Sequence, residues 1–178
     1  MSYATINIEG GLFPPDLLDR VAGAEGGVRG QAAQDFGLST SRRLPDEIQR
    51  SFSDARVYWD AFNRRLERSR ESRTTLTREM WATELFELLG FPPPQYQRAA
   101  IEAGGAAFPI SHRTHAGENA TPVHIVAVDQ GLDERGVQSR RTPHALVQEF
   151  LNRSESLWGV VTNGEKLRLL RDLSLIHI

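Results

Sequence analysis

The amino-acid sequence predicts an α/β fold in which a helical N-terminal segment precedes a sheet covered by further helices. Three observations support this prediction. Apolar residues recur at helical spacing over residues 45–70, and a nearly continuous β-branched run occupies residues 123–128. A short helix at residues 145–151 then leads into two apolar runs separated by Asn163-Gly164. A helix that runs into a strand hairpin cannot bury its apolar face alone, so the upstream residues must supply a sheet.

The C-terminal hairpin is the clearest local signal in the chain. Residues 158–162 and 166–170 form its expected strands. An Asn-Gly pair between two apolar runs favours a type I′ turn, because both central residues of that turn need a positive φ.

The first 73 residues are expected to form an arm and a helical region. The alternation over residues 1–11 indicates a short strand or an extended arm. A small helix is expected at residues 17–22, with Asp16 as its cap. The glycines of residues 23–30 indicate a loop. It is not a phosphate-binding loop, since no apolar strand precedes it and no Gly-Lys-Ser/Thr follows it.

A long helix over residues 45–70 completes this region. Pro45 suits its first turn, and the acidic residues that follow suit the positive end of the helix dipole. Its apolar face is predicted to comprise Ile48, Phe52, Ala55, Trp59, Phe62 and Leu66.

A second helix is expected over residues 76–89, with Thr74 or Thr75 as its cap. Trp81, Leu85, Leu88 and Leu89 form its predicted buried stripe. Gly90 fits the left-handed position that ends such a helix, and the prolines after it prevent continuation.

Strands are expected next. Residues 99–103 and 108–111 indicate two short strands joined at Gly104-Gly105, and residues 112–121 a polar loop. The run over residues 123–128 is rich enough in β-branched side chains to predict a buried, central strand.

Several of these stretches resemble a known family. Gln148 on a helix, followed by LWGVVTNGEKLRLLRD, resembles the end of the nuclease-like domain that precedes the methylase in fused restriction–modification proteins. Type IIG-like enzymes and the large DNA methyltransferases of DISARM-type phage defence share this layout. The stretches IEGGLFPPDLLDRVAG and TREMWATELFELLGF extend the resemblance over nearly the whole chain.

The resemblance implies an N-terminal arm and helical region at residues 1–73 and a restriction-endonuclease-like α/β core at residues 74–172, incomplete at its C-terminus. Active nucleases of this fold place an acid-x-Lys triplet on the central strand, where carboxylates hold a divalent cation. The matching stretch here reads VHIVAVDQ, in which Asp129 is the only acid and no lysine follows. The core is therefore interpreted as degenerate, with no catalytic, cofactor-binding or metal-binding residue.

A nucleic-acid contact is the remaining site hypothesis. Arg68, Arg70 and Arg73 could contact phosphates, although a solvated helix end explains the same residues. Gln148 matches a glutamine that the family often carries, and a contact to backbone phosphate or a structural role is expected for it. His112, His115 and His124 are expected to be structural rather than zinc ligands, because they lie in or beside a loop without cysteine.

For the intact protein the resemblance implies adenine methylation of DNA with S-adenosylmethionine, and DNA and defence-system subunits as partners. This chain lacks the glycine-rich cofactor loop and the Asn-Pro-Pro-aromatic tetrapeptide. It is therefore not expected to bind that cofactor alone. Two other functions stay open: a structural or protein-interaction domain without a nucleic-acid role, and an active metal-dependent nuclease with a migrated catalytic residue.

Composition limits the remaining classes. A net charge of −2 gives no global argument for nucleic-acid binding, and the absence of cysteine excludes disulfides and thiolate metal sites. No apolar run is long enough to span a membrane and no signal peptide is visible, so a cytoplasmic protein is expected. Residues 173–178 resemble a translated sequencing adaptor and are expected to be a non-native tail; a genuine terminal strand fits the same letters.

Overall fold

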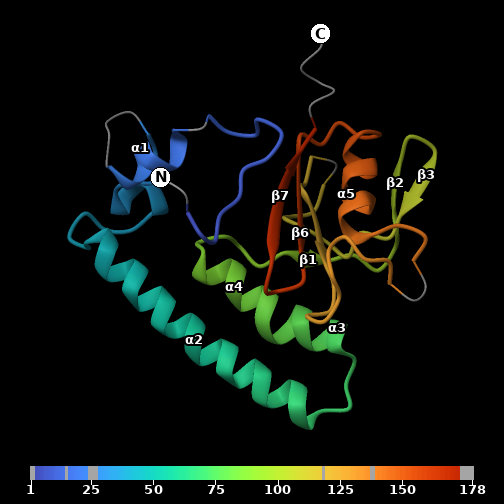
Figure 1. Ribbon diagram of the computed structural model, residues 1–178, viewed down its shortest axis with the longest axis horizontal. Helices are drawn as coiled ribbons and strands as arrows, with labels where there is room; N and C mark the ends of the chain where they lie inside the picture. Colours follow the sequence, from blue (N-terminus) through green and yellow to red (C-terminus); the bar gives the residue numbers. More distant parts are fainter. Residues whose placement is uncertain (1–2, 15, 24–27, 118, 137–138, 173–178) are drawn as a thin grey trace. The chain divides into compact units, whose positions relative to one another are not determined.

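The computed structural model describes residues 3–14, 16–23, 28–117, 119–136 and 139–172 (Figure 1). The chain forms two compact units, Met1–Ser53 and Asp54–Ile178. Their boundary falls inside α2 (Leu44–Arg68), so the second half of this helix belongs with the sheet. No helix among the described residues is both long enough and apolar enough to cross a membrane. The domain limits inferred from the sequence stay predictions, and the expected tail at residues 173–178 lies outside the described residues.

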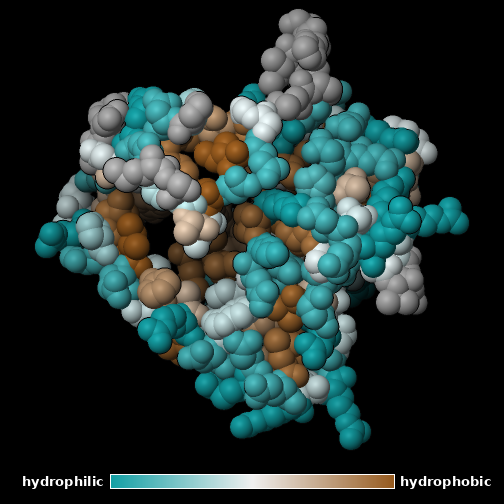
Figure 2. Space-filling view, in the orientation of Figure 1, coloured by the Kyte–Doolittle hydropathy of each residue, from teal (hydrophilic) through white to brown (hydrophobic). Residues whose placement is uncertain are grey.

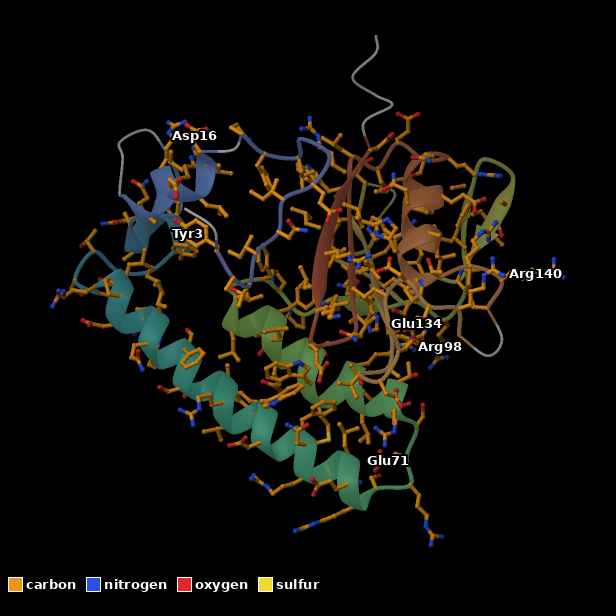
Figure 3. All side chains as sticks on the ribbon, viewed as in Figure 1. Tyr3, Asp16, Glu71, Arg98, Glu134 and Arg140 are labelled. Atoms are coloured by element: carbon orange, nitrogen blue, oxygen red, sulfur yellow. The ribbon has the colours of Figure 1, made fainter. Side chains whose placement is uncertain are left out.

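The first unit contains α1 (Leu17–Ala22) and the short 3₁₀ helix η1 (Ala33–Phe36). Residues 3–11 form turns and irregular chain rather than a strand. The Tyr3 hydroxyl donates to the Leu18 carbonyl at 3.1 Å and fastens this arm to α1 (Figure 3). The prediction that Asp16 caps α1 is wrong, because its side chain makes no capping bond. Its backbone is helical (φ −91°, ψ −2°), whereas a capping residue needs an extended one.

In the second unit one helical stretch follows α2, formed by α3 (Arg73–Leu76), η2 (Thr77–Ala82) and α4 (Thr83–Leu88). It confirms the helix expected at residues 76–89 and the left-handed Gly90, whose φ is 84°. Leu89 does not belong to a buried stripe, because it follows the end of α4 and is 50% exposed. The predicted threonine cap is wrong: the helix starts at Arg73, after Ser72, without a side-chain cap. The middle segment, η2, is a π-helical turn, a feature that no sequence periodicity indicated.

Aromatic side chains join the second half of α2 to this helical stretch. Trp59 meets Trp81 edge-on with ring centroids 4.9 Å apart, and it lies 5.4 Å from Phe62. Phe62 is fully buried. These three rings form a cluster with Leu76, as the spacing of the C-terminal part of the α2 face predicts. The N-terminal part of that face was predicted wrongly, since Ile48 and Phe52 are each 60% exposed.

The main sheet is mixed and has the order β1-β4-β5-β6-β7. The parallel pair β5–β6 is connected through α5 (Pro143–Leu151), whereas the other pairs are antiparallel. A separate two-stranded hairpin is formed by β2 and β3, whose second strand occupies Ala106–Phe108 instead of the expected residues 108–111. The strands are β1 (Gln95–Tyr96), β2 (Ile101–Ala103), β3 (Ala106–Phe108), β4 (His112–Arg113), β5 (Pro122–Ile125), β6 (Trp158–Thr162) and β7 (Leu167–Arg171).

The expected central strand is central and buried. Val123 and Ile125 of β5 pack with Ala82 and Phe86 of the helical stretch, whereas Val126 packs with Val147 of α5 in another cluster. Figure 1 shows α5 along one face of the sheet. The sheet is thus enclosed between helices, as the α/β prediction requires.

Two boundaries of the sheet were predicted wrongly. The central strand was expected to reach residue 128 but ends at Ile125, because the chain turns toward the helical layer, where the Val128 amide donates to Thr77 Oγ1 at 3.0 Å. The polar loop expected from residue 112 begins later, since His112 and Arg113 pair with β1 and β5.

The hairpin of β6 and β7 is confirmed, but its turn is not type I′. Thr162 pairs with Leu167, so four residues form the loop instead of two. The Asn163 side chain replaces the tighter turn: its Oδ1 accepts from the Glu165 and Lys166 amides at 3.1 and 2.8 Å. Its Nδ2 donates to the Gln130 carbonyl at 3.0 Å. Burial of Asn163 therefore decides the loop length.

The tip of this hairpin docks on the π-helical turn. Trp81 Nε1 donates to the Gly164 carbonyl at 2.8 Å. Gly164 has a φ of 90°, and a Cβ there would lie 2.6 Å from Trp81 Cδ1. Glycine is thus required at this position both by the backbone and by the approach of the ring.

Candidate functional site: an arginine-lined edge of the sheet

Asp129, four residues after the end of β5, lies beside Arg73. Asp129 Oδ2 is 3.4 Å from Arg73 Nε, and both side chains are more than half exposed. The only lysine of the chain, Lys166, lies in the loop between β6 and β7. Among the described residues, no group of three or more His, Cys, Asp or Glu is arranged to hold a metal ion. Asp129 is therefore paired with an arginine and not grouped with further carboxylates among the described residues.

The three arginines named from the sequence lie close together along the chain. Arg68 ends α2, Arg70 lies in the connection, and Arg73 begins α3; all three are exposed. Neither Arg68 nor Arg70 forms an ion pair with a described residue, whereas Arg65 pairs with Glu71 in the same connection (Figure 3). Figure 2 shows hydrophilic side chains gathered at this end of α2. These arginines can contact an extended anion.

Gln148 is not brought to the arginines. It lies on α5, which packs on the face of the sheet opposite α4. Its Nε2 donates to Asn152 Oδ1 at 3.1 Å, one helical turn away. The geometry gives Gln148 a local partner on its own helix, separate from the arginine-rich connection.

A pocket that the sequence did not indicate opens next to Arg73. Its volume is about 400 Å³, and Arg78 of η2 lines it together with His124 of β5. Arg78 Nε donates to the Ile125 carbonyl at 3.0 Å, and its guanidinium lies 5.9 Å from the Tyr96 ring centre. We call this the Arg78 pocket. Its full lining is Thr74, Arg78, Pro109, His124, Val126, Gln130, Gly136, Ser139, Arg141, Thr142, Pro143 and Leu146.

Behind the pocket a buried polar network joins β4 and β5. Ser111 Oγ accepts from the Ile125 amide and hydrogen-bonds to His112 Nδ1, both at 2.8 Å. The Ser111 amide donates to His124 Nδ1 at 3.3 Å. Burial, followed by the charge of Arg78, lowers the pKa of both His112 and His124 to about 4. Both imidazoles are therefore neutral at physiological pH.

Burial also lowers the pKa of Arg78, an effect that Tyr96 opposes. One sequence signal could have found Arg78. It precedes Trp81, Ala82 and Leu85 by three, four and seven residues, so it falls on the buried stripe of its helix. A basic residue on such a stripe is costly unless it has a partner or a function.

Comparisons with protein-family models, with curated proteins and with solved structures each found no match to this chain. Function must therefore be inferred from the residues of this chain.

S-adenosylmethionine is the cofactor that the sequence resemblance implies for an intact methyltransferase. The one parallel connection, from β5 through α5 to β6, contains Gly131 and Gly136 but no G-x-G turn between strand and helix. This connection therefore lacks the glycine-rich turn that such a cofactor site needs.

Proposed function

We propose that this chain is a DNA-holding, non-hydrolytic region of a bacterial DNA adenine methyltransferase from a restriction–modification or phage-defence system. Its fold is proposed to be a degenerate nuclease-like core that binds the phosphate backbone. The proposal places the protein in the cytoplasm, where it would meet DNA and defence-system subunits, and it assigns methylation to parts of the intact protein outside this chain.

One observation carries the proposal. At the end of the central strand, a metal-dependent nuclease gathers carboxylates, because the divalent cation needs oxygen ligands. In this protein Asp129 instead faces Arg73 at 3.4 Å, and Arg78 lies on the neighbouring turn of helix. Arginines attract phosphate and repel a metal cation, so this edge is suited to hold DNA rather than to cut it.

Salt-dependent binding tests the DNA-holding role. Replacing Arg68, Arg70 and Arg73 together by alanine should weaken duplex DNA binding and reduce the salt slope by about one unit for each phosphate that the variant no longer binds. Fluorescence anisotropy at salt concentrations from about 50 to about 200 mM measures both the affinity for duplex DNA and its salt slope. The control replaces Arg42, Arg43 and Arg50, three exposed arginines at the other end of α2, of which Arg42 and Arg50 pair with Glu47. Equal binding by the two triple variants would reject the proposed interaction.

A cleavage assay tests the non-hydrolytic role. The purified chain should leave supercoiled and linear DNA intact with magnesium or manganese, and Asp129→Ala should retain DNA binding. Cleavage that disappears in Asp129→Ala would show an active nuclease instead. The binding measurement on Asp129→Ala separates the two roles. DNA binding without cleavage supports the non-hydrolytic role, whereas DNA binding together with cleavage indicates a nuclease.

A further inference from the structure

The lining of the Arg78 pocket selects for negative charge. It contains two arginines, one histidine and several neutral polar side chains, but no Asp or Glu. Arg141 is already neutralised, since its Nε lies 2.5 Å from Glu149 Oε2 and its Nη2 donates to Glu149 Oε1 at 2.9 Å. Arg78 differs, because no described carboxylate pairs with it. The pocket therefore has one uncompensated positive charge at its wall.

The guanidinium of Arg78 is held in place but only partly used. Its Nε bonds to the Ile125 carbonyl, and Tyr96 lies against its face. No described residue accepts a hydrogen bond from either Nη. A planar guanidinium fixed through Nε presents those two nitrogens as a fork, a geometry that matches the oxygens of a phosphate.

His124 supplies a neutral donor to the same cavity. Its Nδ1 accepts from the Ser111 amide, so the proton of the neutral ring lies on Nε2. No described residue hydrogen-bonds to Nε2. Because the pKa of His124 is lowered to about 4, this N–H persists through neutral pH without adding a charge.

Two further polar side chains line the cavity without a partner. Neither the Thr74 hydroxyl nor the Gln130 amide hydrogen-bonds to a described residue, whereas Ser139 and Thr142 bond to nearby backbone. Together with Arg78 and His124 they offer more donors than a carboxylate could use. A tetrahedral phosphate with three strong acceptor oxygens can use them all. The volume of about 400 Å³ lies within the range of small-molecule sites, so a whole nucleotide fits better than a lone ion.

We propose that the Arg78 pocket binds a phosphate monoester of nucleotide size, with phosphate oxygens held by the Arg78 fork and His124 Nε2. This inference rests on the proposed nucleic-acid function and adds a second, concave binding surface to the exposed arginines. The phosphate belongs either to a free mononucleotide or to the phosphorylated end of a nucleic-acid strand. The chemistry of recognition is the same for both.

Isothermal titration of the full chain with adenosine 5′-monophosphate tests the pocket. Arg78→Gln should weaken the affinity at least tenfold, whereas the charge-matched control Arg56→Gln, on the exposed face of α2, should not change it. Arg78→Lys, which keeps the charge but loses the fork, should fall between the two. Circular dichroism shows whether Arg78→Gln is folded. If it is not, Arg78→Lys and His124→Phe test the proposal instead, and each should weaken the affinity for the nucleotide at least threefold. Unchanged affinity in the folded Arg78 variants, or no binding by the original chain, would overturn the proposal.

Competition experiments distinguish the two sources of phosphate. A single-stranded oligonucleotide with a 5′-phosphate should displace the mononucleotide if the ligand is a strand end, whereas the same oligonucleotide with a 5′-hydroxyl should not. If only the mononucleotide binds, the ligand is a free nucleotide, and the pocket is still supported. The Arg68, Arg70 and Arg73 triple variant should keep full mononucleotide affinity. Loss of duplex binding in the triple variant tests the proposed DNA-holding function, and loss of nucleotide binding in Arg78→Gln tests the pocket. Either proposal can therefore be rejected without the other.

Discussion

Two buried histidines beside Arg78 make the stability of this protein depend on pH. The pKa of His112 and of His124 is lowered from 6.5 to about 4, first by burial and then by the charge of Arg78. Because the pKa is lower in the folded than in the unfolded protein, the unfolded state binds more protons between these values. The stabilising contribution is therefore complete above about pH 6.5 and is lost as the pH falls toward 4.

We expect the free energy of unfolding to fall between pH 6.5 and 4 by up to about 1.4 kcal/mol per pH unit for each buried histidine. Urea denaturation across this range measures the slope. His112→Gln should remove part of the slope, because it removes one of the two buried imidazoles. A slope that does not respond to His112→Gln would contradict the assignment.

Asn163 is the single residue on which the hairpin loop depends. Its buried side chain bonds to the carbonyls of Val128 and Gln130 and to two amides of its own loop. Asn163→Ala should lower the free energy of unfolding by roughly 2–4 kcal/mol, since it leaves buried groups without partners. The control Asn152→Ala, at an exposed asparagine that ends α5, should cost less than about 0.5 kcal/mol. Equal losses in chemical denaturation would mean that the network contributes little.

At the scale of elements, the contact between the hairpin tip and η2 fixes the helical layer to the sheet. Trp81 reaches the Gly164 carbonyl, and Thr77 Oγ1 accepts from the Val128 amide at the end of the β5 segment. Both contact residues belong to the π-helical turn η2. Both anchors come from one turn of helix, so the hairpin and the central strand share a single support.

Gly164→Ala tests this support. A methyl group there would meet the Trp81 ring, and the backbone φ of 90° would add strain. Gly105→Ala is the matched control, because Gly105 also has a positive φ (72°) but nothing within 4 Å of an added Cβ. The control should cost about 1 kcal/mol, and Gly164→Ala at least about 1 kcal/mol more. If the melting curves of the two variants coincide, the Trp81 ring can shift to accommodate the added methyl group without a loss of stability.

Elements with strong periodicity were predictable, and those determined by distant contacts were not. The spacing of α2 and the β-branched run of β5 gave the element types correctly, because both patterns repeat over several residues. Burial was correct for β5 and for Phe62, whereas Ile48 and Phe52 of the predicted α2 face are each 60% exposed. The length of the hairpin loop was missed, since it depends on carbonyls of residues 128 and 130 that accept from Asn163. For the same reason Arg78 was missed as a candidate site residue: its significance comes from the Ile125 carbonyl, 47 positions away.

At the scale of the whole molecule, the hydrophobic clusters belong to the second unit. The members of all three clusters come from residues 55 to 170, and before residue 54 only Ala33 is a buried hydrophobic residue among those described. Apolar burial is the main source of stability, so the second unit has its own core.

A chain that begins at Leu44 should therefore fold. It keeps α2 whole, and we expect one cooperative thermal transition with a melting temperature within about 4 °C of the full chain, which corresponds to roughly 1 kcal/mol or less. Differential scanning calorimetry measures this. A larger drop, or loss of cooperativity, would show that residues 1–43 contribute to the core of the second unit.

The position of the only lysine makes the hairpin loop a natural place for a spectroscopic reporter. Lys166 is exposed, and its backbone carbonyl closes the loop by accepting from the Asn163 amide and from Thr162 Oγ1. An amine-reactive dye would therefore label this loop and the α-amino group and no other site. Trp81 donates to the carbonyl of Gly164, two residues before the dye, and can act as an intrinsic energy donor. In a variant whose other two tryptophans, Trp59 and Trp158, are replaced by phenylalanine, recovery of the Trp81 emission would then report undocking of the hairpin tip in real time, without an engineered cysteine.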